Sequence, residues 1–562
     1  MNSIQTLLTD HLDIWTSALL TKSTAGRGSN GKLEAYGIKK LRALILELAV
    51  RGKLVPQDAN DEPASELLEK IAAEKTRLVK QGVIRKENSL PAIADEEKSY
   101  QIPKSWEWVR LTDVYYSISP SGKKLKTSEI VGEGKHPVVD QGQSYIAGYT
   151  NDSELLIVIP GPVVIFGDHT TEIKYIDFDF VAGADGTKIL RPYLMDERFF
   201  YTYLKSYKLE NRGYARHFKV LNDNLYALPP LAEQHRIVAK VDELMALCDQ
   251  LEQQQTHSIE AHQTLVETLL GTLTRVETQQ EFSAAWARIA GHFDTLFTTE
   301  ASIDKLKQTI LQLAVMGKLV PQDPNDESAS VLLEKIAEEK KRMTEDGLIK
   351  KQNPLSPIEA GEKPLPLPDG WECVRFGTVA VIERGGSPRP INAYLTNDPD
   401  GLNWIKIGDT DQGGKYITST SEKIRREGLS KTRMVYPGDF LLTNSMSFGR
   451  PYITKIEGCI HDGWLRISPP KTVDKDYLYL LLSSPYIREA FKVAAAGAVV
   501  LNLNADKVRE LVIPIPPINE QHRIVAKVDE LMALCDTLKA RLADAQAIQL
   551  HLADAIVEQA VC

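Results

Sequence analysis

Two stretches of the chain carry polar and cationic side chains in short loops. Arg and Lys can hydrogen bond to guanine, Asn and Gln to adenine, and Ser, Thr or backbone amides to phosphate. The first stretch offers Lys123, Lys124, Lys126, Gln141, Gln143, His169, Thr170, Arg212, Tyr214, Arg216, His217 and Lys219. The second offers Ser387, Arg389, Asn444, Ser445, Ser447, Arg450, Asn502 and Asn504. These residues are candidate contacts to a nucleic acid, although turn-forming loops with incidental charges would have a similar composition.

The sequence lacks the common motifs of self-contained catalysis. There is no G-x-x-x-x-G-K-[ST] P-loop, no Asn/Asp-Pro-Pro-aromatic tetrapeptide of amino-methyltransferases and no C-x-x-C pair for zinc. Cys248 and Cys535 have the spacing of buried helical positions, and His235 and His522 fall in the first turns of predicted helices. We therefore expect no catalytic residue, no metal site and no cofactor of the chain's own.

The elements that must position the loops come from an internal repeat. The segment EQHRIVAKVDELMALCD occurs at 233–249 and again at 520–536, each time after a double proline. A second pair of similar segments is LRALILELAVRGKLVPQD at 41–58 and LKQTILQLAVMGKLVPQD at 306–323. A fainter similarity relates residues 11–13 to 292–294. The chain thus contains two copies of one unit, but it begins partway through a copy, so that this copy is divided between the two ends of the chain. Its two ends are expected to meet in space.

The repeated pieces predict helices and the pieces between them predict strands. Ile237, Val241, Leu244, Cys248 and Leu251 form a heptad seam on a helix expected from about 231 to 275. GKLVPQD ends a second helix at its Gly, and LLEKIAAEKTRLVKQG forms a short charged helix closed by Gly82. Short apolar runs punctuated by Gly, Pro, Asn and Asp predict β-rich folding for 102–228 and 367–515.

These patterns predict an α+β fold with a pseudo-two-fold circular repeat. Two globular β-rich domains would be separated by long antiparallel paired helices. The expected regions are an N-terminal helical half-repeat (1–101), a first β-rich domain (102–228), a central helical region (229–366), a second β-rich domain (367–515) and a C-terminal helix (516–562).

Composition excludes several classes of protein. The chain has 562 residues, 43% of them hydrophobic and 25% charged, and no apolar run long enough for a membrane helix. With five cysteines and no visible signal peptide, we expect a cytoplasmic protein without a disulfide framework. The net charge of −9 resides in the helical scaffold, because 102–228 carries −1 and 367–515 carries +2. Nearly neutral β-rich domains with local basic clusters permit contact with a nucleic acid on one face.

The whole pattern resembles the specificity subunit of type I restriction–modification enzymes. The resemblance covers essentially the whole chain and rests on PPLAEQHRIVAKVDEL (229–244) and PPINEQHRIVAKVDEL (516–531), the repeated GKLVPQD, and WEWVRL (106–111) with WECVRF (371–376). It implies two target-recognition domains, each of which reads one half of a bipartite double-stranded DNA sequence. The extension of about 100 residues before the first domain is longer than in the smallest members, and we interpret it as the displaced half-repeat.

The resemblance also implies partners. Two methyltransferase (modification) subunits would bring S-adenosylmethionine, restriction/translocase subunits would bring ATP and Mg, and no membrane would be involved. The chain itself would be a non-catalytic subunit of a DNA methyltransferase/endonuclease complex. Two alternatives remain open at this point: a self-contained methyltransferase or nuclease, and a non-catalytic coiled-coil scaffold that presents two ligand-binding domains. The divergent domains do not allow base-reading residues to be carried over from the family.

Overall fold

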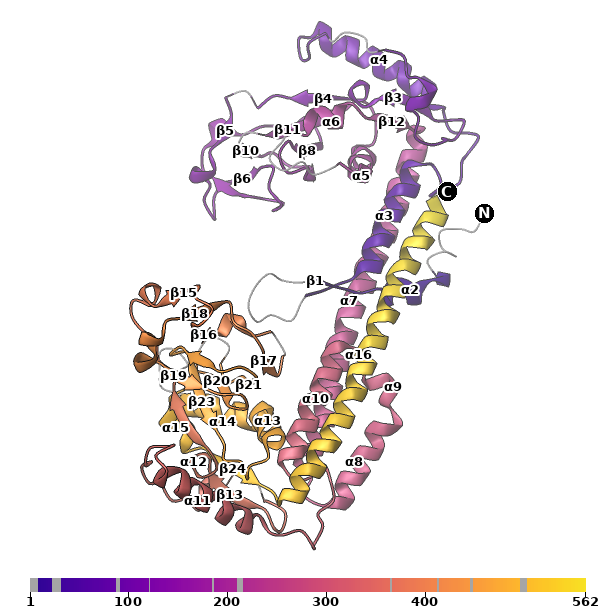
Figure 1. The fold of residues 1–562 in the computed structure, drawn as a ribbon. Coiled ribbons are helices and arrows are strands. Elements are labelled where there is room, and N and C mark those ends of the chain that lie inside the picture. The colour runs from indigo at the N-terminus through magenta and orange to yellow at the C-terminus, as the bar shows by residue number, and fades with distance from the viewer. Residues whose placement is uncertain are drawn as a thin grey trace. The chain divides into compact units, whose positions relative to one another are not determined.

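The chain forms two compact units, and its two longest helices run through both. The computed structural model describes residues 9–22, 32–86, 91–120, 122–183, 186–209, 216–363, 366–411, 414–444, 448–495 and 503–561. The first unit comprises 1–258 with 544–562, and the second comprises 259–543. Helix α7 (Leu231–Arg275) has the bounds that the sequence predicts, and α16 (Ile518–Val561) is its counterpart (Figure 1).

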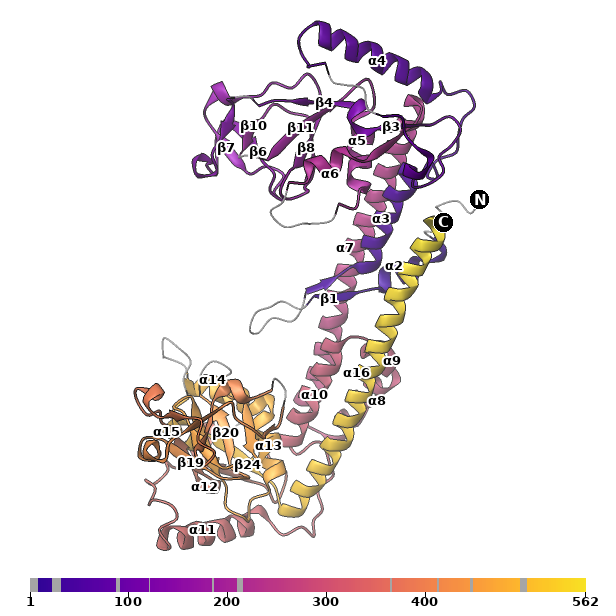
Figure 2. The ribbon, with the colours of Figure 1, turned by 45° about the horizontal axis from the view of Figure 1, so that its top comes forward.

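The first unit carries a β-rich domain whose core lies between two four-stranded sheets. The sheets have the orders β4-β11-β8-β9 and β5-β10-β6-β7, and the separate pairs β3–β12 and β1–β2 are antiparallel. Helix α5 packs against β8, β9 and β11 (Figure 2). The elements are α2 (Leu12–Ser17), β1 (Leu20–Lys22), β2 (Lys32–Glu34), α3 (Tyr36–Val50), α4 (Ala64–Lys80), β3 (Glu107–Arg110), β4 (Tyr115–Ile118), β5 (Lys124–Leu125), β6 (His136–Val139), β7 (Gly148–Thr150), β8 (Val163–Gly167), β9 (Ile173–Ile176), β10 (Val181–Gly183), β11 (Thr187–Pro192), α5 (Glu197–Ser206), α6 (Phe218–Asn222) and β12 (Leu225–Leu228).

The second unit repeats this plan with sheets of five strands instead of four. Its two five-stranded sheets have the orders β14-β23-β20-β21-β17 and β15-β18-β16-β22-β19, and β13 pairs with β24 as β3 pairs with β12. The elements are α8 (Gln279–Gly291), α9 (Phe293–Leu296), α10 (Glu300–Val315), α11 (Ala329–Glu345), β13 (Glu372–Arg375), α12 (Phe376–Val379), β14 (Val381–Arg384), β15 (Leu395–Thr396), β16 (Leu402–Ile405), β17 (Tyr416–Ile417), β18 (Glu422–Ile424), β19 (Arg433–Val435), β20 (Phe440–Thr443), β21 (Pro451–Thr454), β22 (Gly458–Ile460), β23 (Trp464–Ser468), α13 (Lys475–Ser483), α14 (Pro485–Ala495), α15 (Ala505–Arg509) and β24 (Val512–Ile515).

The helical core of each unit confirms the circular repeat. In the first unit the predicted seam of α7 is buried with α3 and with Ala553 near the end of α16. In the second unit the matching seam of α16, including Ile524 and Cys535, is buried with α10 and with Leu270 of α7. The end of the chain closes onto the N-terminal half-repeat, because Lys53 Nζ donates to the carbonyl of Val561 at 2.9 Å.

Glycines end the repeated helices as the sequence predicts. Gly52 after α3 and Gly317 after α10 have φ of +67° and +69°, a conformation that side chains with a Cβ rarely adopt. A Cβ at either position would also lie 2.5 or 2.4 Å from the ring of Pro103 or Pro368. The left-handed turn therefore brings the half-repeat against the segment that begins each β-rich domain.

A buried carboxylate in the first turn of each long helix makes the same junction in both units. Glu233 accepts hydrogen bonds from Trp106 Nε1 at 2.9 Å and from Gln57 Nε2 at 2.5 Å. Glu520 accepts them from Trp371 Nε1 at 3.0 Å and from Gln322 Nε2 at 3.1 Å. Burial raises the pKa of both glutamates, although these hydrogen bonds oppose the shift. The junction joins the helix, the GKLVPQD segment and the tryptophan that directly precedes the first strand of the β-rich domain.

A repeated ion pair lies one turn further along each helix. Arg236 forms two hydrogen bonds to Asp61, at 3.0 and 2.6 Å, and Arg523 forms two to Asp326, at 3.3 and 2.7 Å. The arginine hydrogen bonds lower the pKa of both aspartates. The predicted structural role of the neighbouring histidines also fits, because His235 and His522 lie 3.5 and 3.3 Å from the aspartates that cap α5 and α13.

We expect Asp61→Asn and Asp326→Asn each to destabilise its own unit at pH 7 by about 1.5–3 kcal/mol, the usual contribution of a hydrogen bond to a charged group. Because each folded-state pKa is depressed, the stabilisation is present above the unfolded carboxyl pKa of about 3.9 and is lost as the pH falls through the folded value. Thermal unfolding should therefore separate each variant from the wild type at pH 7 and much less at pH 3. Hydrogen exchange should increase only in the substituted unit, and a uniform increase over both units would contradict independent junctions.

Candidate nucleic-acid interface

Several predicted contact residues of the first β-rich domain follow strands that end at one edge. Strands β5, β10 and β6 are parallel, with Leu125 opposite Gly183 and Val139 opposite Ala182. Lys126 and Gln141 come after the ends of β5 and β6 and therefore lie at the same edge. The end of β8 lies at this edge too, because Gly167 pairs with Thr187, the first residue of β11, which follows β10 in the chain. The residues that follow β8 are Asp168, His169 and Thr170.

Gln141 ties two of these segments together. Its Oε1 accepts a hydrogen bond from the His169 backbone N–H at 3.1 Å, and its carbonyl accepts one from Thr170 Oγ1 at 2.5 Å. Gly186 beside this side chain has a φ of +101°, a conformation that residues with a Cβ rarely adopt. Gln141, His169 and Thr170 are thus brought together, and all three are partly exposed.

Asp168 anchors the described end of the arginine-aromatic segment, Arg212–Lys219, to the same edge. The carbonyl of Asp168 accepts the backbone N–H of His217 at 2.8 Å and faces His217 Nδ1 at 3.0 Å, and its Oδ1 accepts the Phe218 N–H at 2.8 Å. His217 is only 1% exposed, so its ring is positioned to hold the segment rather than to reach a ligand. Arg216 and Lys219 on either side are exposed.

The remaining predictions in this domain are more scattered. Lys123 Nζ donates to the carbonyl of Leu156 at 3.0 Å, Lys124 lies in β5, and Gln143 is exposed two residues after Gln141. Arg212 and Tyr214 lie outside the described residues, as do Ser445, Ser447 and Asn502 of the second domain.

The second domain builds its edge around Asp462, in the turn between β22 and β23. Its Oδ1 accepts the Ser387 hydroxyl at 2.7 Å, its Oδ2 faces Arg389 Nη2 at 3.3 Å, and its carbonyl accepts Asn444 Nδ2 at 2.7 Å. Ser387, Arg389 and Asn444 are thus brought together, although 73 to 75 residues separate Ser387 and Arg389 from Asp462.

Three polar residues of this domain have structural roles. Asn444 is 1% exposed and its carbonyl accepts the Leu503 N–H at 2.9 Å, the counterpart of the bond between Asp168 and His217. Asn504 caps α15 by accepting the N–H groups of Asp506 and Lys507 at 2.7 and 3.1 Å. His461 has a backbone N–H facing each ring nitrogen, from Gly463 at 2.7 Å and Ile407 at 3.3 Å, and burial lowers its pKa. Arg450 is exposed.

Asp168 and Asp462 organise the two edges, but neither was among the predicted contacts. For Asp462 the available signal was the Asp-Gly dipeptide at 462–463 before a long strand, and the same dipeptide occurs at 185–186. Asp185 itself lies outside the described residues. The dipeptide is a common turn signal and by itself carries no functional meaning.

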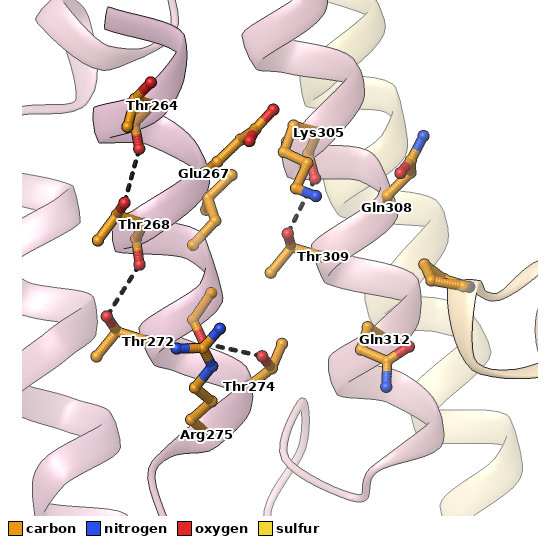
Figure 3. Close-up of a pocket in the computed structure, with 13 residues that line it drawn as sticks. Thr264, Glu267, Thr268, Thr272, Thr274, Arg275, Lys305, Gln308, Thr309 and Gln312 are labelled. Atoms are coloured by element: carbon orange, nitrogen blue, oxygen red, sulfur yellow. Dashed lines mark hydrogen bonds between the residues drawn. The ribbon is translucent and has the colours of Figure 1, made fainter. Parts of the chain in front are cut away.

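A groove of about 540 Å³ in the second unit lies on the helical scaffold, between α7 and α10 (Figure 3). The hydroxyls of Thr264, Thr268 and Thr272 donate to the carbonyls four residues earlier, at 2.8–3.0 Å. Its walls include Glu267 and Arg275, which belong to the exposed polar face of α7. The groove therefore offers no converging set of ligand-binding groups.

Two classes of site find no support within the described part of the chain. No group of three or more His, Cys, Asp or Glu residues there could hold a metal ion. The helices of the same ranges include none that is both long and apolar enough to cross a membrane.

Comparison with known proteins identifies the family. The family of the type I restriction modification DNA specificity domain matches residues 103–261 and 368–545. The EcoAI and EcoEI type I restriction enzyme specificity subunits of Escherichia coli are 40% and 39% identical over 604 and 596 residues, with full coverage of both chains. A solved structure on complex assembly and conformational transition of the type I R-M system has a chain that aligns at 19% identity and a TM-score of 0.43, covering 82% of this chain and 99% of that chain. The two strand-end edges thus stand on a chain that belongs to the type I restriction–modification DNA specificity family.

Proposed function

We propose that the chain reads a bipartite double-stranded DNA target, with one recognition domain for each half-site. The observation that carries this proposal is the pair of strand-end edges, which have the same backbone frame and different side chains. The backbone carbonyls of Asp168 and Asn444 accept equivalent hydrogen bonds, from the N–H groups of His217 and Leu503. The side chains differ, since one edge presents Gln141, His169 and Arg216 and the other presents Ser387 and Arg389. Two domains with the same backbone arrangement and different polar side chains are suited to read two different base sequences.

The duplicated scaffold supports a partner that binds twice. Leu247 and Leu534, at matching positions of the identical segments 233–249 and 520–536, are 45% and 55% exposed. Leu265 and Leu552, beyond these segments but at the same offset of 287, are 50% and 44% exposed. Exposed leucines at repeat-related positions favour two copies of one partner. In this proposal the copies are the methyltransferase subunits, which supply S-adenosylmethionine chemistry, while restriction/translocase subunits supply ATP and Mg. The chain itself contributes recognition and no catalytic group.

Co-expression with the modification subunits tests the proposal directly. Sequencing of adenine methylation in the host genome should reveal one target with two fixed halves and a spacer of constant length. A gel shift of the full chain with these subunits against random duplexes should show binding. Binding without any base preference would instead favour a scaffold that presents two other ligand-binding domains.

Exchanging one recognition domain should change one half of the target. We suggest replacing residues 111–224 by the same segment of another family member, because this retains Trp106 and the β3–β12 ladder. The methylated sequence should keep one half-site and the spacer. If both half-sites change in a folded protein, the domains do not read independently.

Lengthening the long helices should lengthen the spacer. Four residues inserted after Thr256 in α7, with four after Ala543 in α16, add about 6 Å to each helix, the length of between one and two base pairs at about 3.4 Å each. Both insertions lie next to the boundary between the two units. Methylation mapping should show the same half-sites with a longer spacer, and an unchanged spacer would refute the role of the helices as a ruler.

Arg216 tests whether the arginine-aromatic segment contacts DNA. If its guanidinium binds a guanine, Arg216→Ala should cost about 1–3 kcal/mol and relax one position of one half-site. If it binds only phosphate, all duplexes should be weakened alike and the salt slope should fall by about one. Affinities for cognate and single-mismatch duplexes at several salt concentrations distinguish these results. Unchanged affinity and slope would remove the segment from the interface.

A further inference from the structure

Arg389 in the second recognition domain is both exposed and held. Its side chain is 79% exposed, and one of its terminal nitrogens, Nη2, lies 3.3 Å from Asp462 Oδ2. An exposed ion pair of this kind adds little to stability. Its effect is on geometry, because it restricts a long side chain that otherwise samples many rotamers. Most of the guanidinium N–H groups remain available on the solvent side.

The loop that carries Arg389 is fixed at its base. The N–H groups of Gly385 and Gly386 donate to the carbonyls of Trp464 and Ile460, at 2.9 and 3.2 Å. A Cβ on Gly385 would lie 2.2 Å from the carbonyl oxygen of His461, so only glycine allows this approach. Ser387 then donates its hydroxyl to Asp462 Oδ1 at 2.7 Å. The arginine therefore begins two residues beyond a rigid attachment.

The turn that carries Asp462 is equally fixed. The buried Asn444 donates to the Asp462 carbonyl and its own N–H donates to the Gly463 carbonyl at 3.0 Å. The Ser387 hydrogen bond is the main cause that lowers the pKa of Asp462, and Arg389 and His461 add to it. The carboxylate is consequently ionised at neutral pH. If this edge binds DNA, as proposed, a fixed negative charge there repels phosphates and needs a compensating role.

We propose that Arg389 reads a guanine in the half-site of the second recognition domain and that Asp462 is the positioning residue that aims it. This inference rests on the proposed function and names the residues that carry it out. Two guanidinium N–H groups can bind O6 and N7 of guanine while a third stays on Asp462. Asp462 thus orients the Arg389 guanidinium before DNA binds, which lowers the conformational entropy lost on binding.

The test uses the full chain with its modification subunits and a library of duplexes in which each position of both half-sites is varied in turn. Arg389→Ala should reduce discrimination at one G·C pair by about 5- to 100-fold, with all other positions unchanged. Arg389→Lys keeps the charge and loses the fork, so it should lose the same discrimination while the salt slope is kept. Arg488→Ala, at an exposed position of α14, is the charge-matched control and should leave the base preferences unchanged.

Asp462→Asn separates positioning from stability. The amide can still accept the Ser387 hydroxyl, but it no longer attracts the guanidinium. Discrimination at the same G·C pair should fall, whereas affinity for non-specific duplexes should stay equal or rise, since a negative charge is removed. The double variant Arg389→Ala/Asp462→Asn should lose no more discrimination than Arg389→Ala alone, because Asp462 acts through the arginine.

Three results would overturn the inference. Arg389→Ala could weaken all duplexes alike with a salt slope lower by about one, which identifies a phosphate contact. It could leave every base preference intact, or Asp462→Asn could retain full discrimination. By contrast, a wild-type complex without preference at any position would reject the proposed function itself.

Discussion

A carboxylate buried in the first turn of each long helix is the constraint on which both units depend. Removing a carboxylate from water costs several kcal/mol, to an order of magnitude, unless donors replace the lost hydration. Glu233 and Glu520 obtain those donors from a tryptophan indole and a glutamine amide, and the amino end of a helix favours their charge. Since the donors come from the GKLVPQD segment and from the start of the recognition domain, satisfying one carboxylate fixes three segments.

This constraint explains why the ends of the repeat are alike while the middles differ. The junction residues must satisfy a buried charge, so a change in any of them leaves an unpaired polar group. The exposed side chains of the recognition edges, such as Arg216 and Arg389, carry no such penalty, because water is an alternative partner. Backbone bonds preserve the frame, as in the pairing of Asp168 with His217 and of Asn444 with Leu503. Side chains on that frame can change without unfolding the domain.

The sequence predicted the scaffold well, but it did not predict which distant polar residues meet, for a physical reason. The seam from Ile237 to Cys248 follows from periodicity, and the glycine after α3 follows from the helix signals around it; both are local patterns. Residues such as Ser387 and Asp462 meet across 75 positions, and no local pattern records that meeting. For the same reason His217 and Asn504 were predicted as contacts, although burial and helix capping use their polar groups. Whether the exposed candidates contact DNA stays a prediction.

The distribution of charge bears on how such a reader could be selective. With net charges of −1 and +2, the regions 102–228 and 367–515 offer little bulk attraction to DNA, and the rest of the chain carries −10. A strongly basic surface would bind every duplex through counterion release, and non-specific sites would compete with the target. In a nearly neutral domain, affinity has to come from a few directed contacts or from partners that bring their own charge. Directed contacts require groups held in place: Asp168 fixes the backbone next to Arg216, and Asp462 holds the side chain of Arg389.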